Sequence, residues 1–411
     1  GVQVTDQPPS LTGQFRITRV RLRHYRSIAA CDVQLGRMAL LVGANGAGKS
    51  SFLDSLRLVA DSLQTTLDHA LRDRGGISEV RRRATGHPTH LSVYLDFVHP
   101  GGTGSYGFRV AAVKGKDFRI SHEQCEVNGF DPADASAGAL FSGPTSFKVH
   151  NGELLQGPGL ALPPPSRDRL FLVAASAVPA FRSVYDGLAG VNVYNINPDS
   201  MRQLQTPDAG EILRRDGSNI ASVIERLRRE NPGIKKRIED YLQQIVHGVG
   251  NVERVSFGTY ETIEVDQQVA GAQSPWAFQA TSVSDGTLRA LGVLTALFAG
   301  SENQLSPIGI EEPESALHPA AARLLLDALR DASERRQILV TSHSPDLLDN
   351  SSIRESEILA VTATAGQTTI GRLDSTARAA LENSLFTPGE LMRVSQLQPD
   401  PIPVAQIDLF R

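Results

Sequence analysis

Residues 43–50, GANGAGKS, have the types and spacing of a loop that binds nucleotide phosphates. Glycines let backbone N–H groups converge on phosphate oxygens, and a helix that begins in the loop adds the partial positive charge of its amino end. Lys49 is expected to reach the β- and γ-phosphates and to act in catalysis, and Ser50 to hold magnesium. The predicted cofactor-binding residues of this segment are Gly43, Asn45, Gly46, Gly48, Lys49, Ser50 and Ser51.

A second segment, IGIEEPESALHP at residues 308–319, places carboxylates at the end of a short apolar run. Because it follows a predicted strand, it can lie beside the phosphate loop in one sheet. Glu311 is then predicted to join Ser50 at the magnesium ion, and Glu312 to orient and polarise the attacking water. Taken alone, the segment is more typical of an acidic strand end in solvent.

Two further polar segments lie downstream of the phosphate loop. Ser284, Asp285 and Gly286 begin a predicted helix, where a hydroxyl and free amides form a second anion site. His343 follows a predicted strand, where it could meet a γ-phosphate. Each is by itself more typical of an ordinary helix cap or of a structural histidine. The fixed order of all four segments argues against coincidence and favours a nucleotide-hydrolysing site.

Hydrophobic periodicity predicts the elements that must position these residues. Strands are expected at residues 15–22, 31–35, 38–43, 91–97, 107–113 and 118–127, with a helix directly after the phosphate loop. Residues 128–169, rich in Gly and Pro, are expected to form a flexible loop. A helical pattern fills about 178–250, and strands then alternate with helices, which implies a parallel sheet. The expected domains are an N-terminal lobe 1–175, a helical lobe 176–280 and a C-terminal lobe 281–411.

Composition narrows the class of protein. The 411 residues hold 41 Lys+Arg against 45 Asp+Glu, so no global basic field indicates nucleic acid. Cys31 and Cys125 have no metal-ligand spacing and are expected to be buried thiols. No apolar run reaches the length of a membrane span, and no leader is evident. We expect a cytoplasmic protein without a membrane partner.

The order of the four segments resembles the ABC-type ATPase head of the RecF, SMC and OLD-nuclease group, and VRLRHYRSIAACDVQL before the loop is similar to their N-terminal strands. The nearest resemblance is to standalone bacterial AAA family ATPases of this group. It implies an α/β P-loop ATPase head with an antiparallel β subdomain and an inserted helical lobe. It also implies ATP and Mg²⁺ as cofactors and a homodimer that sandwiches ATP between two heads.

The resemblance also implies roles for single residues. Glu312 would be the catalytic carboxylate, His343 the histidine that senses the γ-phosphate, and Ser284 to Gly286 the contact to ATP on the other subunit. Ser-Asp-Gly-Thr replaces the Ser-Gly-Gly-Gln of transporters, which suits the RecF-like branch. Glu311 stands where Asp is usual, although the nearest relatives share the Ile-Glu-Glu-Pro-Glu form. The glutamine loop of the broader family has no clear counterpart in the sequence.

Three functions remain open at this point. The favoured one is an ATP-driven dimeric switch that acts on DNA or licenses a separately encoded effector, such as a Toprim-type nuclease, in DNA repair or antiviral defence. Arg81, Arg82 and Arg83 are candidate DNA contacts, although such runs are more often solvated surface. The alternatives are a low-turnover nucleotide-binding scaffold and a transport-type motor. No long coiled coil and no Asp-x-Asp pair after His343 is present, which argues against DNA tethering and a nuclease within this chain.

Overall fold

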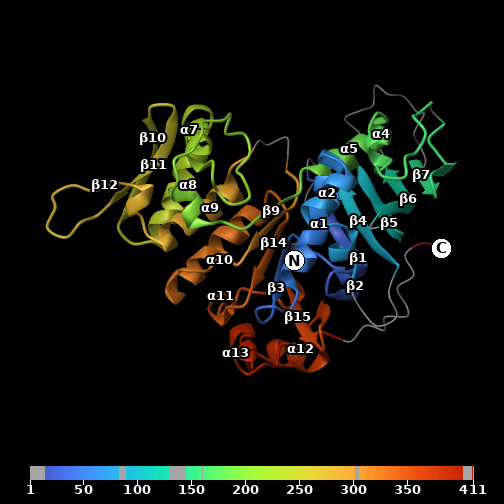
Figure 1. The fold of residues 1–411 in the computed structure, drawn as a ribbon. Coiled ribbons are helices and arrows are strands. Elements are labelled where there is room, and N and C mark those ends of the chain that lie inside the picture. The colour runs from blue at the N-terminus through green and yellow to red at the C-terminus, as the bar shows by residue number, and fades with distance from the viewer. Residues whose placement is uncertain are drawn as a thin grey trace, which may run out of the picture.

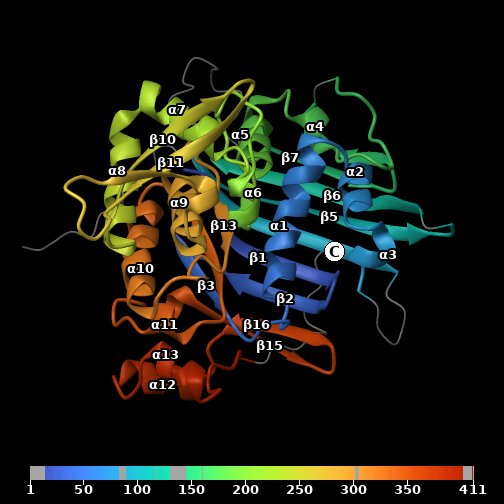
Figure 2. The same ribbon diagram turned by 60° about the vertical axis from the view of Figure 1, so that its left-hand side comes forward.

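The computed structural model describes residues 14–82, 89–115, 117–129, 145–159, 161–300, 305–400 and 410. Its centre is a 13-stranded sheet with the strand order β8-β7-β6-β5-β4-β1-β2-β16-β15-β3-β14-β13-β9. In Figures 1 and 2 the antiparallel strands β4 to β7 lie at one end of the molecule, and α7, α8 and β10 to β12 lie at the other. The predicted α/β head with an antiparallel β subdomain is confirmed.

The strands of the main sheet include all those predicted from the sequence. They are β1 (Arg16–Tyr25), β2 (Ile28–Gln34), β3 (Met38–Val42), β4 (His90–His99), β5 (Gly102–Val113), β6 (Asp117–Gly129), β7 (Thr145–His150), β8 (Glu153–Gln156), β9 (Asn192–Tyr194), β13 (Ile308–Glu311), β14 (Ile338–Ser342), β15 (Ile358–Thr364) and β16 (Gln367–Arg372). A separate three-stranded sheet is formed by β10 (Val249–Phe257), β11 (Tyr260–Gln267) and β12 (Trp276–Gln279).

The longer helices are those predicted from the sequence together with Ser375–Glu382, which was not predicted. They are α1 (Lys49–Gln64), α5 (Pro179–Ala189), α7 (Ile220–Glu230), α8 (Pro232–Ile245), α9 (Asp285–Phe298), α10 (Pro319–Ser333) and α12 (Ser375–Glu382). The shorter ones are α2 (Leu67–Asp73), α3 (Ile77–Val80), α4 (Leu172–Ala175), α6 (Pro198–Arg202), α11 (Pro345–Leu348) and α13 (Pro388–Arg393). In the described ranges, single turns of 3₁₀ helix lie at Ala280–Ser282 and Glu355–Glu357.

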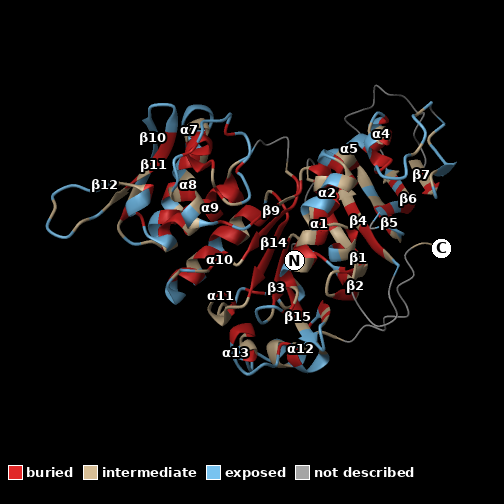
Figure 3. Cartoon of the chain, viewed as in Figure 1, coloured by how far each residue is buried: buried red, intermediate tan, exposed pale blue. Residues whose placement is uncertain are grey.

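The parallel strands β9, β13, β14, β3 and β15 bring the motif segments to one edge of the sheet. Their register pairs Glu311 with Thr341 and Ser342 with Val42, so the carboxyl ends of β13, β14 and β3 are level. The phosphate loop follows the end of β3, Glu312 follows the end of β13, and His343 follows the end of β14. Figure 3 shows β3 and β14 as buried strands, and β13 is buried along its whole length as well, which is why these strands read as apolar runs.

The expected lobe boundary near residue 176 lies inside a continuous core. Phe181, Val184 and Leu188 of α5 pack in the same buried cluster as α1 and the antiparallel strands. Strand β9 then pairs with β13 at the edge of the main sheet. The helical lobe that we expected at 176–280 therefore begins only after β9, because α5 packs in the core of the N-terminal lobe. It includes the sheet β10 to β12 beside α7 and α8, and it shares a second core with α9 and α10.

The expected loop at residues 128–169 is only partly a loop. Strand β6 continues to Gly129, and β7 pairs with β6 and β8 as an antiparallel extension of the sheet. In β7 only Phe147 and Val149 are buried, so the strand is too short for its alternation to stand out among Gly and Pro. Residues 130–144 and 160 lie outside the described residues. Cys31 and Cys125 are buried free thiols, as expected, and no helix in the described ranges is long and apolar enough to span a membrane.

Glu123 on β6 ties the antiparallel strands to α4. Its carboxylate accepts hydrogen bonds from the N–H groups of Phe171 (2.5 Å) and Leu172 (3.0 Å) and from the Tyr106 hydroxyl (2.9 Å). Burial raises the pKa of Glu123 from 4.5 to about 7. The folded chain therefore holds this proton more tightly than the unfolded chain, and the resulting stability is lost as the pH rises from 4.5 to about 7.

A comparison with Glu123→Gln, which cannot titrate, tests this assignment. Relative to the variant, the wild type is expected to lose on the order of 2–3 kcal/mol of unfolding free energy between about pH 5 and pH 8. Urea titrations at several pH values measure the difference. Glu126→Gln, a change at an exposed carboxylate of the same strand, is the control. The difference in unfolding free energy between this variant and the wild type should not show that dependence on pH. A constant difference between wild type and Glu123→Gln would contradict the raised pKa.

Candidate nucleotide site

The phosphate loop joins β3 to α1 in a conformation that two glycines make possible. Gly48 has φ +111°, and a Cβ there would lie 2.2 Å from the Thr368 hydroxyl oxygen. A Cβ on Gly43 would lie 2.1 Å from the carbonyl oxygen of Val361. Thr368 of β16 also donates to the carbonyl oxygen of Ala47 at 2.7 Å, so the hairpin β15–β16 supports the loop from behind. Larger residues at these two glycines would force the loop away from its support.

The amino end of α1 is open to an anion. Its N-cap residue, Gly48, has no side chain to cap the first-turn N–H groups, which include those of Ser50 and Ser51. Asn45, Gly46 and Ser50 are exposed, and Ser51 is half-buried. Uncapped amides and a serine hydroxyl are suitable partners for phosphate oxygens and for a magnesium ion.

Lys49 is buried at the base of the loop, with 6% of its surface exposed. Its ammonium donates to the carbonyl oxygens of Gly43 (2.6 Å) and Ala44 (3.0 Å). Burial lowers the pKa of Lys49, and the negative charges of Glu312 and Glu314 oppose that shift. In the described part of the chain, the hydrogen-bond partners of the ammonium are thus neutral carbonyl groups of the loop, while Glu312 and Glu314 act on it through their charge. A phosphate would give it charged ones.

Glu312 and His343 meet across the ends of β13 and β14. The His343 Nδ1 atom lies 2.9 Å from Glu312 Oε1. Glu312 has a left-handed backbone with φ +45°, and its N–H donates to the Thr341 carbonyl oxygen at 2.9 Å. Such a conformation is unfavourable for a residue with a side chain and is typical of functional sites. The left-handed backbone of Glu312 turns the chain away from the direction of β13 directly after Glu311.

Glu311 is the last residue of β13 and is buried. One of its carboxylate oxygens lies 3.2 Å from the Arg215 guanidinium. Arg215 precedes α7 and belongs to none of the sequence motifs. The structure thus brings a cation from the start of the helical lobe to the residue that we assign to the magnesium ion.

Glu314 is a second residue that the sequence analysis missed as a site candidate. It accepts a hydrogen bond from the Ser342 hydroxyl at 2.6 Å through Oε1, while its buried Oε2 has no hydrogen-bond partner in the described part of the chain. Burial raises the pKa of Glu314, and the negative charge of Glu312 adds to the shift. A buried carboxylate oxygen without a partner leaves room for a donor such as a water molecule. Its place after Pro313 in the acidic segment was the only signal in the sequence.

The helix α9 carries the Ser284, Asp285 and Gly286 segment at its amino end. Ser284 caps the helix by accepting from the Thr287 N–H at 3.3 Å, and Asp285 is paired with Arg202. Ser284 and Asp285 are exposed, and a Cβ on Gly286 would lie 2.7 Å from the carbonyl oxygen of Ala316. In the described residues no hydrogen bond joins Ser284 or Asp285 to the phosphate loop of the same chain.

Arg289, one turn into α9, connects that helix to the carboxylate segment. Its guanidinium donates to the carbonyl oxygens of Ile196 (2.6 Å), Glu311 (3.2 Å) and Glu312 (2.9 Å). Burial lowers the pKa of Arg289, and the three glutamates Glu311, Glu312 and Glu314 oppose the shift. A displacement of α9 would therefore also displace the backbone at Glu311 and Glu312, the two candidate carboxylates.

Two of the three candidate DNA contacts, Arg81 and Arg82, lie beside the turn between β1 and β2. Arg81 forms an isolated β-bridge with Tyr25, and Arg82 donates from its side chain to the Ser27 carbonyl oxygen at 2.6 Å. Arg83 lies outside the described residues. The Arg82 side chain thus contacts Ser27, the residue in the turn between β1 and β2 whose hydroxyl is bonded to Thr368.

The residues at this edge fit a magnesium nucleotide. The chain offers uncapped helix amides, a buried ammonium, a serine hydroxyl and carboxylates at the ends of adjacent strands. Within the described ranges, no group of three or more His, Cys, Asp and Glu side chains could hold a metal ion by itself.

Comparisons with known proteins agree with the fold. The chain is similar to a solved SMC head bound to the C-winged helix domain of ScpA, with 14% identity and a TM-score of 0.53 over 88% of this chain and 99% of that one. It is also similar to the Smc head with an extended coiled coil from Pyrococcus furiosus, bound to the C-terminal domain of ScpA. That match has 12% identity and a TM-score of 0.54 over 90% of this chain and 100% of the other. No curated protein matches.

A family model described as "AAA domain, putative AbiEii toxin, Type IV TA system" matches residues 38–123 and 215–349, more than half of the chain. The first block contains the phosphate loop, and the second contains Ser284, Glu312 and His343. This chain therefore belongs to that family of AAA domains, built on the fold of an SMC-type ATPase head.

Proposed function

We propose that the protein hydrolyses ATP with magnesium and acts as a dimeric switch. The observation that carries the proposal is the meeting of three segments at one sheet edge. Glu312 and His343 are in contact at 2.9 Å. The charge of Glu312 also acts on the buried Lys49 of the phosphate loop. An ordinary acidic turn would not need a buried ammonium and a histidine beside it.

Each residue then has a part in hydrolysis. Lys49 and the amides of the loop bind the phosphates, while Ser50 and Glu311 would hold the metal. A bound magnesium ion would neutralise phosphate charge and align the β- and γ-phosphates. Glu312 orients a water molecule and accepts its proton as the water attacks the γ-phosphorus. His343, through its contact to Glu312, keeps that carboxylate in place.

The dimer is proposed because the α9 segment contacts its own chain elsewhere. Ser284 and Asp285 are exposed at the amino end of a helix of 14 residues, and their hydrogen bonds run to Thr287 and Arg202. A helix amino end favours an anion. A second head could therefore present its bound ATP to Ser284, Asp285 and Gly286. Each of two nucleotides would then be enclosed by both subunits.

For the output of the switch we propose a protein effector or DNA. The family description names a putative toxin of a type IV toxin–antitoxin system, which favours a role in defence. The solved SMC heads carry a domain of the protein ScpA, which supports a protein partner for a head of this fold. A separately encoded Toprim-type nuclease remains our specific candidate. Arg81, Arg82 and Arg83 remain candidate DNA contacts, although the engagement of Arg82 with Ser27 weakens that assignment.

The wild-type protein provides the first test. It is expected to release phosphate from ATP only with Mg²⁺, and to sediment as a dimer with Mg²⁺ and a non-hydrolysable ATP analogue but as a monomer without nucleotide. Sedimentation velocity and a phosphate-release assay measure the two results. A protein that binds the analogue yet stays monomeric would refute the sandwich. One that forms the dimer without releasing phosphate would be a scaffold.

A further inference from the structure

Arg215 pairs with the carboxylate that the proposed function assigns to magnesium. Its guanidinium lies 3.2 Å from Glu311 Oε2. The Glu311 side chain is 10% exposed and that of Arg215 is 43% exposed, so the carboxylate is fixed in the core while the arginine reaches it from the surface. Among the described residues, Arg215 is the sole cation within ion-pair distance of Glu311. The neighbouring Arg289 contacts carbonyl oxygens instead.

A guanidinium and a magnesium ion compete for this carboxylate. Each is attracted by the single negative charge, and two cations a few ångströms apart repel each other. Glu311 already has another cation near it in Arg289, whose pKa responds to the charge of Glu311. Adding a divalent ion therefore favours the departure of the most mobile cation, which is the half-exposed Arg215.

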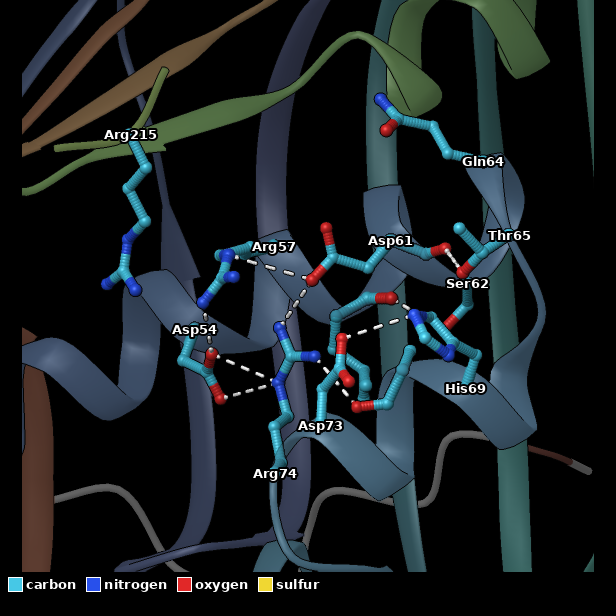
Figure 4. A network of polar contacts seen from close by, with 12 residues as sticks. Asp54, Arg57, Asp61, Ser62, Gln64, Thr65, His69, Asp73, Arg74 and Arg215 are labelled. Atoms are coloured by element: carbon cyan, nitrogen blue, oxygen red, sulfur yellow. Dashed lines mark hydrogen bonds and ion pairs between the residues drawn. The ribbon is translucent and has the colours of Figure 1, made fainter. Parts of the chain in front are cut away.

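The surroundings give Arg215 space to move while its backbone stays anchored. The Asn195 N–H donates to the Arg215 carbonyl oxygen at 3.0 Å, and the Asn197 N–H donates to that of Asp216 at 3.0 Å. The side chain borders a pocket of about 170 Å³ whose other lining residues include Arg57, Asp61, Gln64, Asn192 and Tyr194. Figure 4 shows Arg215 pointing to the face of α1 that carries Arg57 and Asp61.

The geometry points to Arg215 as a positioning residue that holds Glu311 in the nucleotide-free head and is exchanged for Mg²⁺ when the magnesium nucleotide binds. This inference rests on the proposed function. Without the metal, the arginine stabilises a buried carboxylate that would otherwise lack a charged partner. Arg215 lies just before α7. When the metal binds, the exchange therefore also changes a contact at the start of the helical lobe. Arg215 makes metal binding weaker than the site alone would allow.

The test is a magnesium titration of nucleotide binding, read by a fluorescent non-hydrolysable ATP analogue. Arg215→Ala is expected to lower the Mg²⁺ concentration at half-maximal binding by roughly threefold to tenfold, the range for a partly exposed ion pair. Without Mg²⁺, wild type and variant should bind the analogue equally. Arg214→Ala is the matched control, because Arg214 is paired with Asp208 at 3.5 Å and should leave the midpoint unchanged.

A second background shows whether Glu311 mediates the effect. In Glu311→Gln, the additional change Arg215→Ala should shift the Mg²⁺ midpoint no further. An unchanged or raised midpoint for Arg215→Ala in the wild-type background would overturn the inference, as would weaker binding of the analogue without Mg²⁺, which would make Arg215 a phosphate ligand. A wild-type protein that binds no nucleotide at any Mg²⁺ concentration would instead refute the proposed function itself.

Discussion

Replacing Lys49 with alanine is expected to weaken ATP binding by roughly tenfold to more than a hundredfold, because a charge-assisted bond to phosphate contributes about 1.5–3 kcal/mol. The loss should be large because the ammonium is buried and already positioned by the carbonyl oxygens of Gly43 and Ala44. Isothermal titration with a non-hydrolysable analogue measures the change.

The control for Lys49→Ala is Lys114→Ala, which removes the same charge from an exposed position after β5. That variant should bind the analogue like the wild type. Thermal unfolding of both variants verifies that they are folded. If Lys49→Ala keeps the affinity of the wild type, the phosphate loop is not the nucleotide site, and the assignments of Ser50 and Glu311 fail with it.

Replacing Glu312 with glutamine is expected to slow ATP turnover by about 10²- to 10⁴-fold while ATP binding is kept. Glutamine has nearly the shape of glutamate, so it can keep the contact to His343 and the left-handed backbone at this position. It cannot accept the proton of the attacking water. Since the hydrolysis that would separate the heads is blocked, the variant should accumulate as a dimer with Mg²⁺ and ATP.

Phosphate release and sedimentation velocity, done on the same preparation, measure both effects of Glu312→Gln. Glu382→Gln, at an exposed carboxylate near the end of α12, is the matched control and should behave as wild type. Turnover at the wild-type rate would remove Glu312 from the catalytic role and leave Glu314 as the nearest alternative carboxylate. A monomer at saturating ATP in a variant that turns over slowly would exclude the sandwiched dimer.

The sequence by itself determined the local parts of this protein. A loop of Gly, Lys and Ser between a buried strand and a helix has few other uses, since glycines at positions 43 and 48 are required by close contacts and by a positive φ. The apolar runs of β3, β13 and β14 follow from burial on both faces of a parallel sheet. Short strands without that burial, such as β7 and β8 in the expected loop, escaped because one or two apolar residues form no recognisable period.

Only the tertiary structure decided which side chains surround the motif residues. Arg215 and Glu311 are 96 positions apart, Thr368 and Ala47 are 321 apart, and Arg289 reaches Glu312 from helix α9. The register of the parallel strands and the packing of α9 determine these contacts, and no local sequence pattern encodes them. The same register levels the ends of β3, β13 and β14, which brings Lys49, Glu312 and His343 together. Residue types predict the chemistry of the site because each motif is a short segment of sequence. The charged side chains that act on the motif residues are brought there by long-range packing.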